Sequence, residues 1–357
     1  TCLLVRYEPG ADRPTAKRAR GLGSVPAVLS AIASVVALLV LIGLTDWAAL
    51  GPASRRAIGD PVGLALITAT LLGAFSLRAL AWTRLLPDLR LATALSAIHL
   101  ALGANHVLPL RLGEPLRVVA AVRRGGVDVG AATGSTVVLR TADIVSLLVI
   151  GLVAGPRFVA TMLGSWGLVL VLGLVLVGLA VIALVGFGPL RFGWLARLGT
   201  GHRLSSSAVA LTAAAWLLEA IVVWRVATWF DVGLGASEAV VVLAVAVGSQ
   251  ILAVTPAGLG TYEAAASAAL VATGVPLSTA LALAVTLHGV KTIYSLAAGG
   301  LALFRPGTSL LGRLRLPKRL PTVDPVPVDP TAPVVLFLPA NDEGPRIADV
   351  IAATPDR

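Results

Sequence analysis

The chain carries ionisable residues inside stretches that are otherwise apolar. Arg140 and Asp143 lie three residues apart in the stretch 130–154, a spacing that places both on one helix face, where they can pair. Glu219 and Arg225 lie six residues apart on different faces of a later apolar stretch, so each needs a partner on another helix. A charge inside a membrane costs about 3 kcal/mol on insertion scales, so these residues are candidates for ligand binding or transport.

A further apolar stretch, 276–304, holds His288 and Lys291 on one helix face and contains no acid. Lys291 is therefore a strong functional candidate, whereas Arg140 and Asp143 could equally form an ion pair that only fixes helix register. Arg78 stands near the end of its apolar stretch. We interpret it as a side chain that extends along the helix to the membrane surface.

Catalytic and metal-binding signals are weak. The histidines are His99, His106, His202 and His288, and their spacing is not that of metal ligands. The single cysteine, Cys2, excludes a disulfide framework and a cysteine-based metal site. We expect no catalytic residue, no metal and no other cofactor in the chain as given.

The apolar segment 91–108 ends in a break. Asn105 lies at the end of the expected helix, and Pro109 stops that helix because proline has no N–H and disfavours helix in the residue before it. Glu114-Pro115 then begins a second helix, since proline suits the first helical position and an acid suits the positive end.

The apolar segment 238–273 is broken in a similar way. The turn-forming residues of this second break are Pro256, Gly258 and Gly260. We expect Thr261 to cap the helix that follows, with Glu263 in its first turn. That helix would be about 18 Å long, too short to cross a hydrocarbon core of about 30 Å.

The two breaks share the pattern Pro-x-x-x-Gly with an acid just beyond, and they fall in matching positions of two halves of the chain. Interrupted helices in matching positions are the best sequence indication of a transport site. The alternative is a pair of ordinary interhelical loops with turn-forming residues.

The composition indicates a membrane protein. Of the 357 residues, 57% are hydrophobic and 13% charged, about half the charged fraction of a soluble domain. The formal net charge of +10 does not indicate nucleic-acid binding, because the basic residues lie in loops between apolar runs, where the positive-inside bias places them.

The expected fold is an all-α polytopic membrane protein. Full spans are expected at 25–44, 62–82, 130–154, 164–187, 207–230 and 276–304, which makes six. The segments before and after the two breaks become re-entrant hairpins that enter from opposite faces, in an inverted-repeat arrangement. Basic loops, including 111–124 and 191–203, are predicted to be cytoplasmic together with both termini, and the acidic loop 231–238 lies outside.

Three motifs resemble the flippase-like family, also called the lysylphosphatidylglycerol synthase transmembrane region, over about residues 25–305. They run from Asn105 to Arg117, from Leu139 to Asp143 and from Thr255 to Glu263. The resemblance implies a part in lipid translocation or in lipid-linked glycan pathways. Because the chain has few lysines and much alanine, glycine and valine, we expect a bacterial plasma-membrane protein.

The two ends of the chain differ from the middle. Residues 1–24 are polar and basic, and 306–333 form a basic and then proline-rich linker. Residues 334–357 resemble the first strand, loop and helix of a family 2 glycosyltransferase, an incomplete α/β start. That resemblance, which rests on a short match, implies a nucleotide-sugar site at Asp342 and Glu343, and whether the chain is a fragment of a longer glycosyltransferase fusion stays open.

The leading hypothesis is a module that binds and moves an anionic lipid, either a phospholipid or a polyprenyl phosphate. The proposed counter-charges are Arg111, Arg117, Arg140 and Lys291. The supporting residues are Asn105, Glu114, Asp143, Glu219, Arg225, Pro256, Gly258, Gly260 and Glu263. The alternatives are the membrane part of a lipid-linked glycosyltransferase, which would be an enzyme, and a non-transporting anchor. Expected partners are membrane lipid and enzymes of a polyprenyl-phosphate pathway, but no nucleic acid; the oligomeric state stays open.

Overall fold

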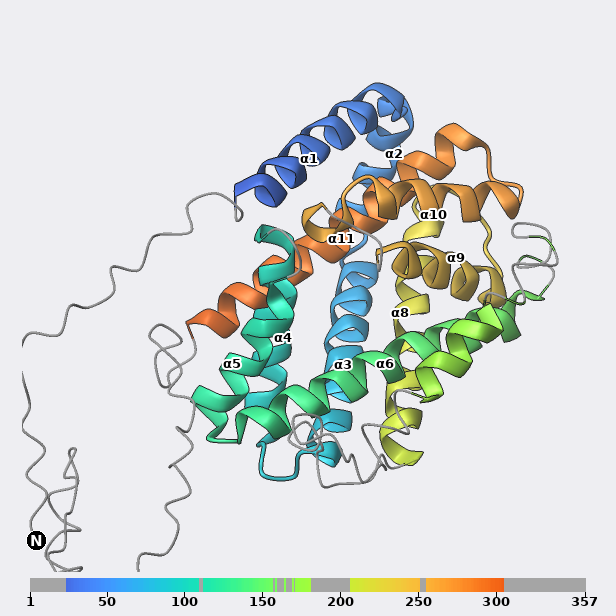
Figure 1. Ribbon diagram of the computed structural model, residues 1–357. Coiled ribbons are helices and arrows are strands. Elements are labelled where there is room, and N and C mark those ends of the chain that lie inside the picture. Colours follow the sequence, from blue (N-terminus) through green and yellow to red (C-terminus); the bar gives the residue numbers. More distant parts are fainter. Residues whose placement is uncertain are drawn as a thin grey trace, which may run out of the picture. The chain divides into compact units, whose positions relative to one another are not determined.

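The computed structural model describes residues 24–108, 112–156, 158, 164, 169, 171–180, 206–250 and 255–304, and these ranges contain helices but no strands (Figure 1). The chain forms two compact units, Thr1–Leu314 and Arg315–Arg357, and every described residue belongs to the first.

The chain begins its described part with two helices at a sharp angle. Helix α1 covers Ser24–Leu44 and α2 covers Trp47–Ile58, and the two are bent by 91° at the break between them. The Asp46 side chain accepts the N–H groups of Ala48 and Ala49, which caps α2. No helix was expected between the spans 25–44 and 62–82, so α2 corrects the sequence-based prediction.

The first half of the helical core runs from α3 to α6. Its helices are α3 (Pro61–Leu85), α4 (Leu91–Val107), α5 (Gly113–Gly125) and α6 (Val129–Ala154). The Asp60 and Asp128 carboxylates cap α3 and α6 by accepting backbone N–H groups. Gly126 ends α5 with φ 71°, a left-handed conformation that glycine adopts without steric cost.

The second half repeats this order of elements. Its helices are α8 (Ser206–Thr228), α9 (Ala236–Ser249), the 3₁₀ turn η3 (Pro256–Gly258), α10 (Thr261–Ala272) and α11 (Leu277–Leu303). The predicted cap of α10 is wrong by one residue, because Gly260 is the N-cap and Thr261 is the first helical residue. The Glu263 carboxylate accepts the Gly260 N–H at 2.7 Å, as a residue in the first turn can do.

The same helix contacts occur again when each helix is replaced by its counterpart from the other half. Helix α4 packs on α5 and on α11, and correspondingly α9 packs on α10 and on α6 (Figure 1). Helix α3 packs on α8, and the two run antiparallel, since Asp60 before α3 contacts Arg225 near the end of α8. Corresponding helices that run antiparallel are what an inverted repeat requires.

One close approach of two backbones holds the halves together. Gly103 of α4 and Gly299 of α11 lie so close that a Cβ added at Gly299 would be 2.7 Å from the Gly103 Cα. Small residues that let helices approach closely are typical of packing in membranes.

Four of the described helices are long and apolar enough to cross a membrane, namely α3, α6, α8 and α11. The number becomes five if the bent pair α1 and α2 forms one span. The predicted count of six is not confirmed, because only Val171–Ala180 of the predicted span 164–187 is described as a continuous helix. The linker and the tail after residue 304 lie outside the described residues.

Candidate functional site

The two helix breaks meet at one polar cavity. A cavity of about 390 Å³ is lined by the end of α4, the start of α5, the end of α9, η3 and the start of α10. The long helices α3, α6, α8 and α11 complete its wall. The segments that the sequence separates into two halves therefore come together around one space.

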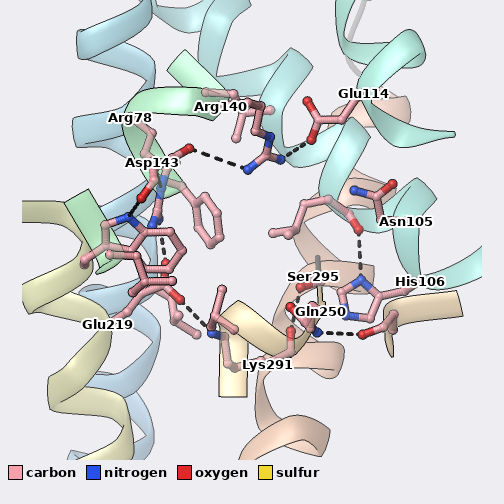
Figure 2. Close-up of a pocket in the computed structure, with 18 of the residues that line it drawn as sticks. Arg78, Asn105, His106, Glu114, Arg140, Asp143, Glu219, Gln250, Lys291 and Ser295 are labelled. Carbon is pink, nitrogen blue, oxygen red and sulfur yellow. Dashed lines mark hydrogen bonds and ion pairs between the residues drawn. The ribbon is translucent and has the colours of Figure 1, made fainter. Parts of the chain in front are cut away.

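Ionised side chains of alternating sign form a chain along this cavity (Figure 2). In order, they are Arg117, Glu114, Arg140, Asp143, Arg78, Glu219 and Lys291. Glu114 contacts Arg140 directly. The other N-to-O distances are 3.9 Å for Arg117–Glu114, 3.5 Å for Arg140–Asp143, 3.3 Å for Arg78–Asp143, 2.6 Å for Arg78–Glu219 and 2.7 Å for Lys291–Glu219. The sequence-based pairing of Arg140 with Asp143 is confirmed.

Arg78 is the central member of this chain, and its interpretation as a side chain at the membrane surface is wrong. It is 8% exposed and contacts both Asp143 and Glu219. Its guanidinium also lies 4.1 Å from the ring centroid of Trp216, a cation–π contact. Arg78 points inward because α3 packs against α8, where Glu219 is 3% exposed and needs a cation.

The two ends of the charged chain are cations. Lys291, whose own helix contains no acid, donates to Glu219 of α8. Arg117 is 4% exposed, and its guanidinium lies 4.0 Å from the ring centroid of Trp82. The Arg140 side chain, at 45%, is the most exposed member of the chain, so the cavity is accessible beside α5 and α6.

The site has the same internal repetition as the fold. Arg140 and His288 occupy the same position counted from the start of α6 and α11, and Asp143 and Lys291 each follow three residues later. Each of the two earlier residues contacts the acid in the first turn of the preceding short helix. Arg140 contacts Glu114 in this way, and His288 Nδ1 lies 2.6 Å from the carboxylate of the corresponding acid, Glu263.

Each break is held by one side-chain amide, and the two amides occupy corresponding positions in the two halves. Asn105 and Gln250 stand at the same position counted from the start of α4 and α9. The Asn105 side-chain oxygen accepts the Gly113 N–H at 2.9 Å, and the Gln250 side chain donates to the Ala257 carbonyl at 2.6 Å. Asn105 was predicted, whereas Gln250 was missed. Its signal was the match to Asn105 just before the second break.

The cavity has an excess of positive charge and of donors. Among the described lining residues, four cations face three acids, so the ionised groups sum to one positive charge when histidine is neutral. Arg78 Nη2 and Arg117 Nε are buried and have no hydrogen-bond partner among the described residues. Buried donors are normally paired, so these two N–H groups could donate to an acceptor that enters the cavity.

The other predicted residues of the second half lie outside the cavity lining. Pro256 and Gly258 bound η3, and Gly258 and Gly260 have φ of 79° and 85°, values that favour glycine. Glu263 is 2% exposed and reaches the cavity through His288. Arg225 does not line the cavity, because it pairs with Asp60 beyond the start of α3.

Some predicted residues have no structural description. Arg111, Asp342 and Glu343 lie outside the described residues. Within the described ranges, no group of three or more His, Cys, Asp and Glu side chains could hold a metal ion.

Comparison with known proteins identifies one family. The family described as "Lysylphosphatidylglycerol synthase TM region" matches residues 28–299. Comparisons with curated proteins and with solved structures give no match. The match covers α2 to α10 and nearly all of α11, and with them every described member of the charged chain. The chain is therefore a multi-pass integral membrane protein and belongs to the lysylphosphatidylglycerol synthase transmembrane-region family.

Proposed function

We propose that the cavity binds the phosphate of an anionic lipid and that the protein moves this lipid across the membrane. The observation that carries the proposal is the chain of alternating charges, which ends in a cation on both sides and includes buried guanidinium N–H groups that have no hydrogen-bond partner among the described residues. A phosphate oxygen would accept these N–H groups, and its negative charge would offset the excess cation.

A lipid suits the surroundings of the cavity better than a soluble anion does. An apolar groove of about 690 Å³ lies between α1, α10 and α11 and includes Gly260 of the second break. Tyr262, two residues further on, lines the polar cavity. The groove would hold an acyl or prenyl chain while the phosphate occupies the polar cavity, as the amphipathic shape of such a lipid requires.

Movement of the lipid is supported by the repeated halves. Transporters of this kind bind substrate between interrupted helices of inverted repeats and expose it alternately to the two faces. Here the two breaks belong to matching hairpins that share one cavity. The loop charges favour an orientation with both termini in the cytoplasm, and the low lysine content with much alanine, glycine and valine favours a bacterial plasma membrane. A phospholipid and a polyprenyl phosphate offer the same phosphate chemistry to the site.

The experiment is lipid translocation by purified protein in liposomes, followed with a headgroup-labelled anionic lipid that a membrane-impermeant quencher reaches from outside. Arg117→Gln and Lys291→Gln remove the terminal cations, and each should slow translocation about tenfold or more, because a hydrogen bond to a charged group contributes about 1.5–3 kcal/mol. Arg84→Gln is the matched control, since Arg84 is exposed at the end of α3.

The outcome separates the proposal from its rivals. Wild-type translocation rates in both cavity variants would contradict an anion site, and absence of both binding and translocation in the wild type would favour a non-transporting anchor. Binding without translocation would instead favour a module that presents an acceptor lipid to an enzyme.

A further inference from the structure

The second half of the site has a titratable group where the first half has a permanent cation. His288 occupies the position in α11 that Arg140 occupies in α6, and each contacts the acid of the preceding short helix. Arginine stays charged at any physiological pH, whereas imidazole changes charge between about pH 5 and 8. The repetition therefore pairs a fixed charge with one that a proton can switch.

The hydrogen bonds of His288 define which nitrogen is free to accept the proton. Its Nδ1 lies 2.6 Å from Glu263 Oε1, and a carboxylate only accepts, so Nδ1 carries the hydrogen. In the neutral ring Nε2 is then an acceptor, and it is buried without a hydrogen-bond partner among the described residues. Protonation would turn Nε2 into a charged donor on a residue that lines the cavity.

Other ionisable groups face His288 from three helices. On α10, the Tyr262 ring centroid lies 4.5 Å from the imidazole, beside Glu263. On α4, the ring centroid of His106 is 6.4 Å away. On α11 itself, Lys291 follows after three residues and is held by Glu219 of α8. Glu263 is the only acid in direct contact with His288 among the described residues.

A link from this pair to the helix break already exists in the geometry. One oxygen of the Glu263 carboxylate faces His288, and the other accepts the N–H of Gly260, the N-cap of α10. A change of charge on His288 therefore acts on the group that holds the second break in place.

Resting on the proposed function, we infer that His288 takes up a proton when the cavity binds the lipid phosphate, so that binding of the anion and binding of the proton favour each other. The proton goes to Nε2, which then donates to a phosphate oxygen, while Nδ1 stays bonded to Glu263. Linkage is reciprocal, so a lower pH strengthens lipid binding by as much as the lipid strengthens proton binding.

The test is the dissociation constant of phosphatidylglycerol from the purified full chain in neutral detergent, measured between about pH 5 and 8. A phosphodiester keeps its single charge over this range, so only the protein titrates. We expect the wild-type dissociation constant to rise with pH by up to about tenfold per unit, the limit for one linked proton. His288→Gln should bind weakly and independently of pH, whereas His288→Arg, which copies the first half, should bind tightly and independently of pH.

His99→Gln is the matched control, because His99 is also a buried histidine but does not line the cavity, and it should keep the wild-type pH dependence. Thermal unfolding of each variant checks that it is folded, and the opposite expectations for Gln and Arg distinguish the inference from general damage. Saturable wild-type binding with no pH dependence, or a pH dependence that survives in His288→Gln, would overturn the inference alone. Absence of saturable binding at every pH would remove the proposed function and the inference with it.

Discussion

Arg78→Ala removes the central link of the charged chain and should destabilise the protein more than the loss of any exposed arginine. Removing one partner of a buried ion pair costs about 3–5 kcal/mol, because the remaining charge stays buried. Asp143 and Glu219 would each keep a second cation, Arg140 at 3.5 Å and Lys291 at 2.7 Å, which favours the lower limit.

The stacking of the Arg78 guanidinium on Trp216 adds a smaller contribution of about 1 kcal/mol. The expected loss is therefore about 3–4 kcal/mol in the free energy of unfolding. The assay is reversible unfolding in mixed micelles with a rising fraction of denaturing detergent, with Arg84→Ala, on the same helix, as the control. We expect that control to change the stability by less than about 0.5 kcal/mol.

A double-mutant cycle of Arg78→Gln with Glu219→Gln isolates the direct contact, whose N-to-O distance is 2.6 Å. Residues in one ion-pair network show coupling energies of about 0.5–3 kcal/mol, and this buried pair should fall in the upper half of that range. A loss of stability in Arg78→Ala no larger than in Arg84→Ala, or a coupling energy close to zero, would show that Arg78 does not hold the charged chain together.

Three further predictions concern packing, pH and topology. Gly299→Leu should force α4 away from α11 and destabilise the protein by about 1–3 kcal/mol in the same unfolding assay; unchanged stability would contradict the close approach. Hydrogen bonds from the Trp229 indole and a backbone N–H hold the pKa of Asp60 below its usual value, so their stabilisation is present at neutral pH and is lost as the pH falls below about 4. Trp229 fluorescence should report this transition, and Asp60→Asn should abolish it. In a chain without its native cysteine, Ser237→Cys should react with an impermeant thiol reagent added to intact cells and Ser206→Cys should not, because the loop charges predict that the end of α8 faces outside and its start faces the cytoplasm; the reverse labelling would contradict this predicted topology.

The fold was predictable where composition and turn chemistry act locally. Apolar length predicted α3, α6, α8 and α11, and proline and glycine predicted both breaks. Helix α2 was missed because it contains Pro52 and two arginines, a pattern that resembles a loop when packing is unknown. The tertiary contact of α2 with α11 and α3 stabilises it, and no local signal reports that contact.

The site was predictable in its residue types but not in its partners. Helical spacing predicted the contact of Arg140 with Asp143, yet the same rule gave no partner for Glu219 or Lys291. Arg78 was misinterpreted because its position near a helix end is equally compatible with an exposed side chain. Only the antiparallel packing of α3 against α8 shows that it faces an acid, and that packing joins residues far apart in the sequence.

Equilibrium binding of phosphatidylglycerol to the purified protein, at a pH near 6 in neutral detergent, tests the central claim most directly. The comparison is between Arg117→Gln/Lys291→Gln, which removes both terminal cations of the cavity, and Arg84→Gln/Arg90→Gln, which removes equal charge from exposed positions. We expect saturable binding by the wild type and the exposed-charge variant, no comparable binding of phosphatidylcholine, and at least about a hundredfold loss of affinity in the cavity variant, since two charged hydrogen bonds are removed. Equal affinity of the two double variants would contradict it.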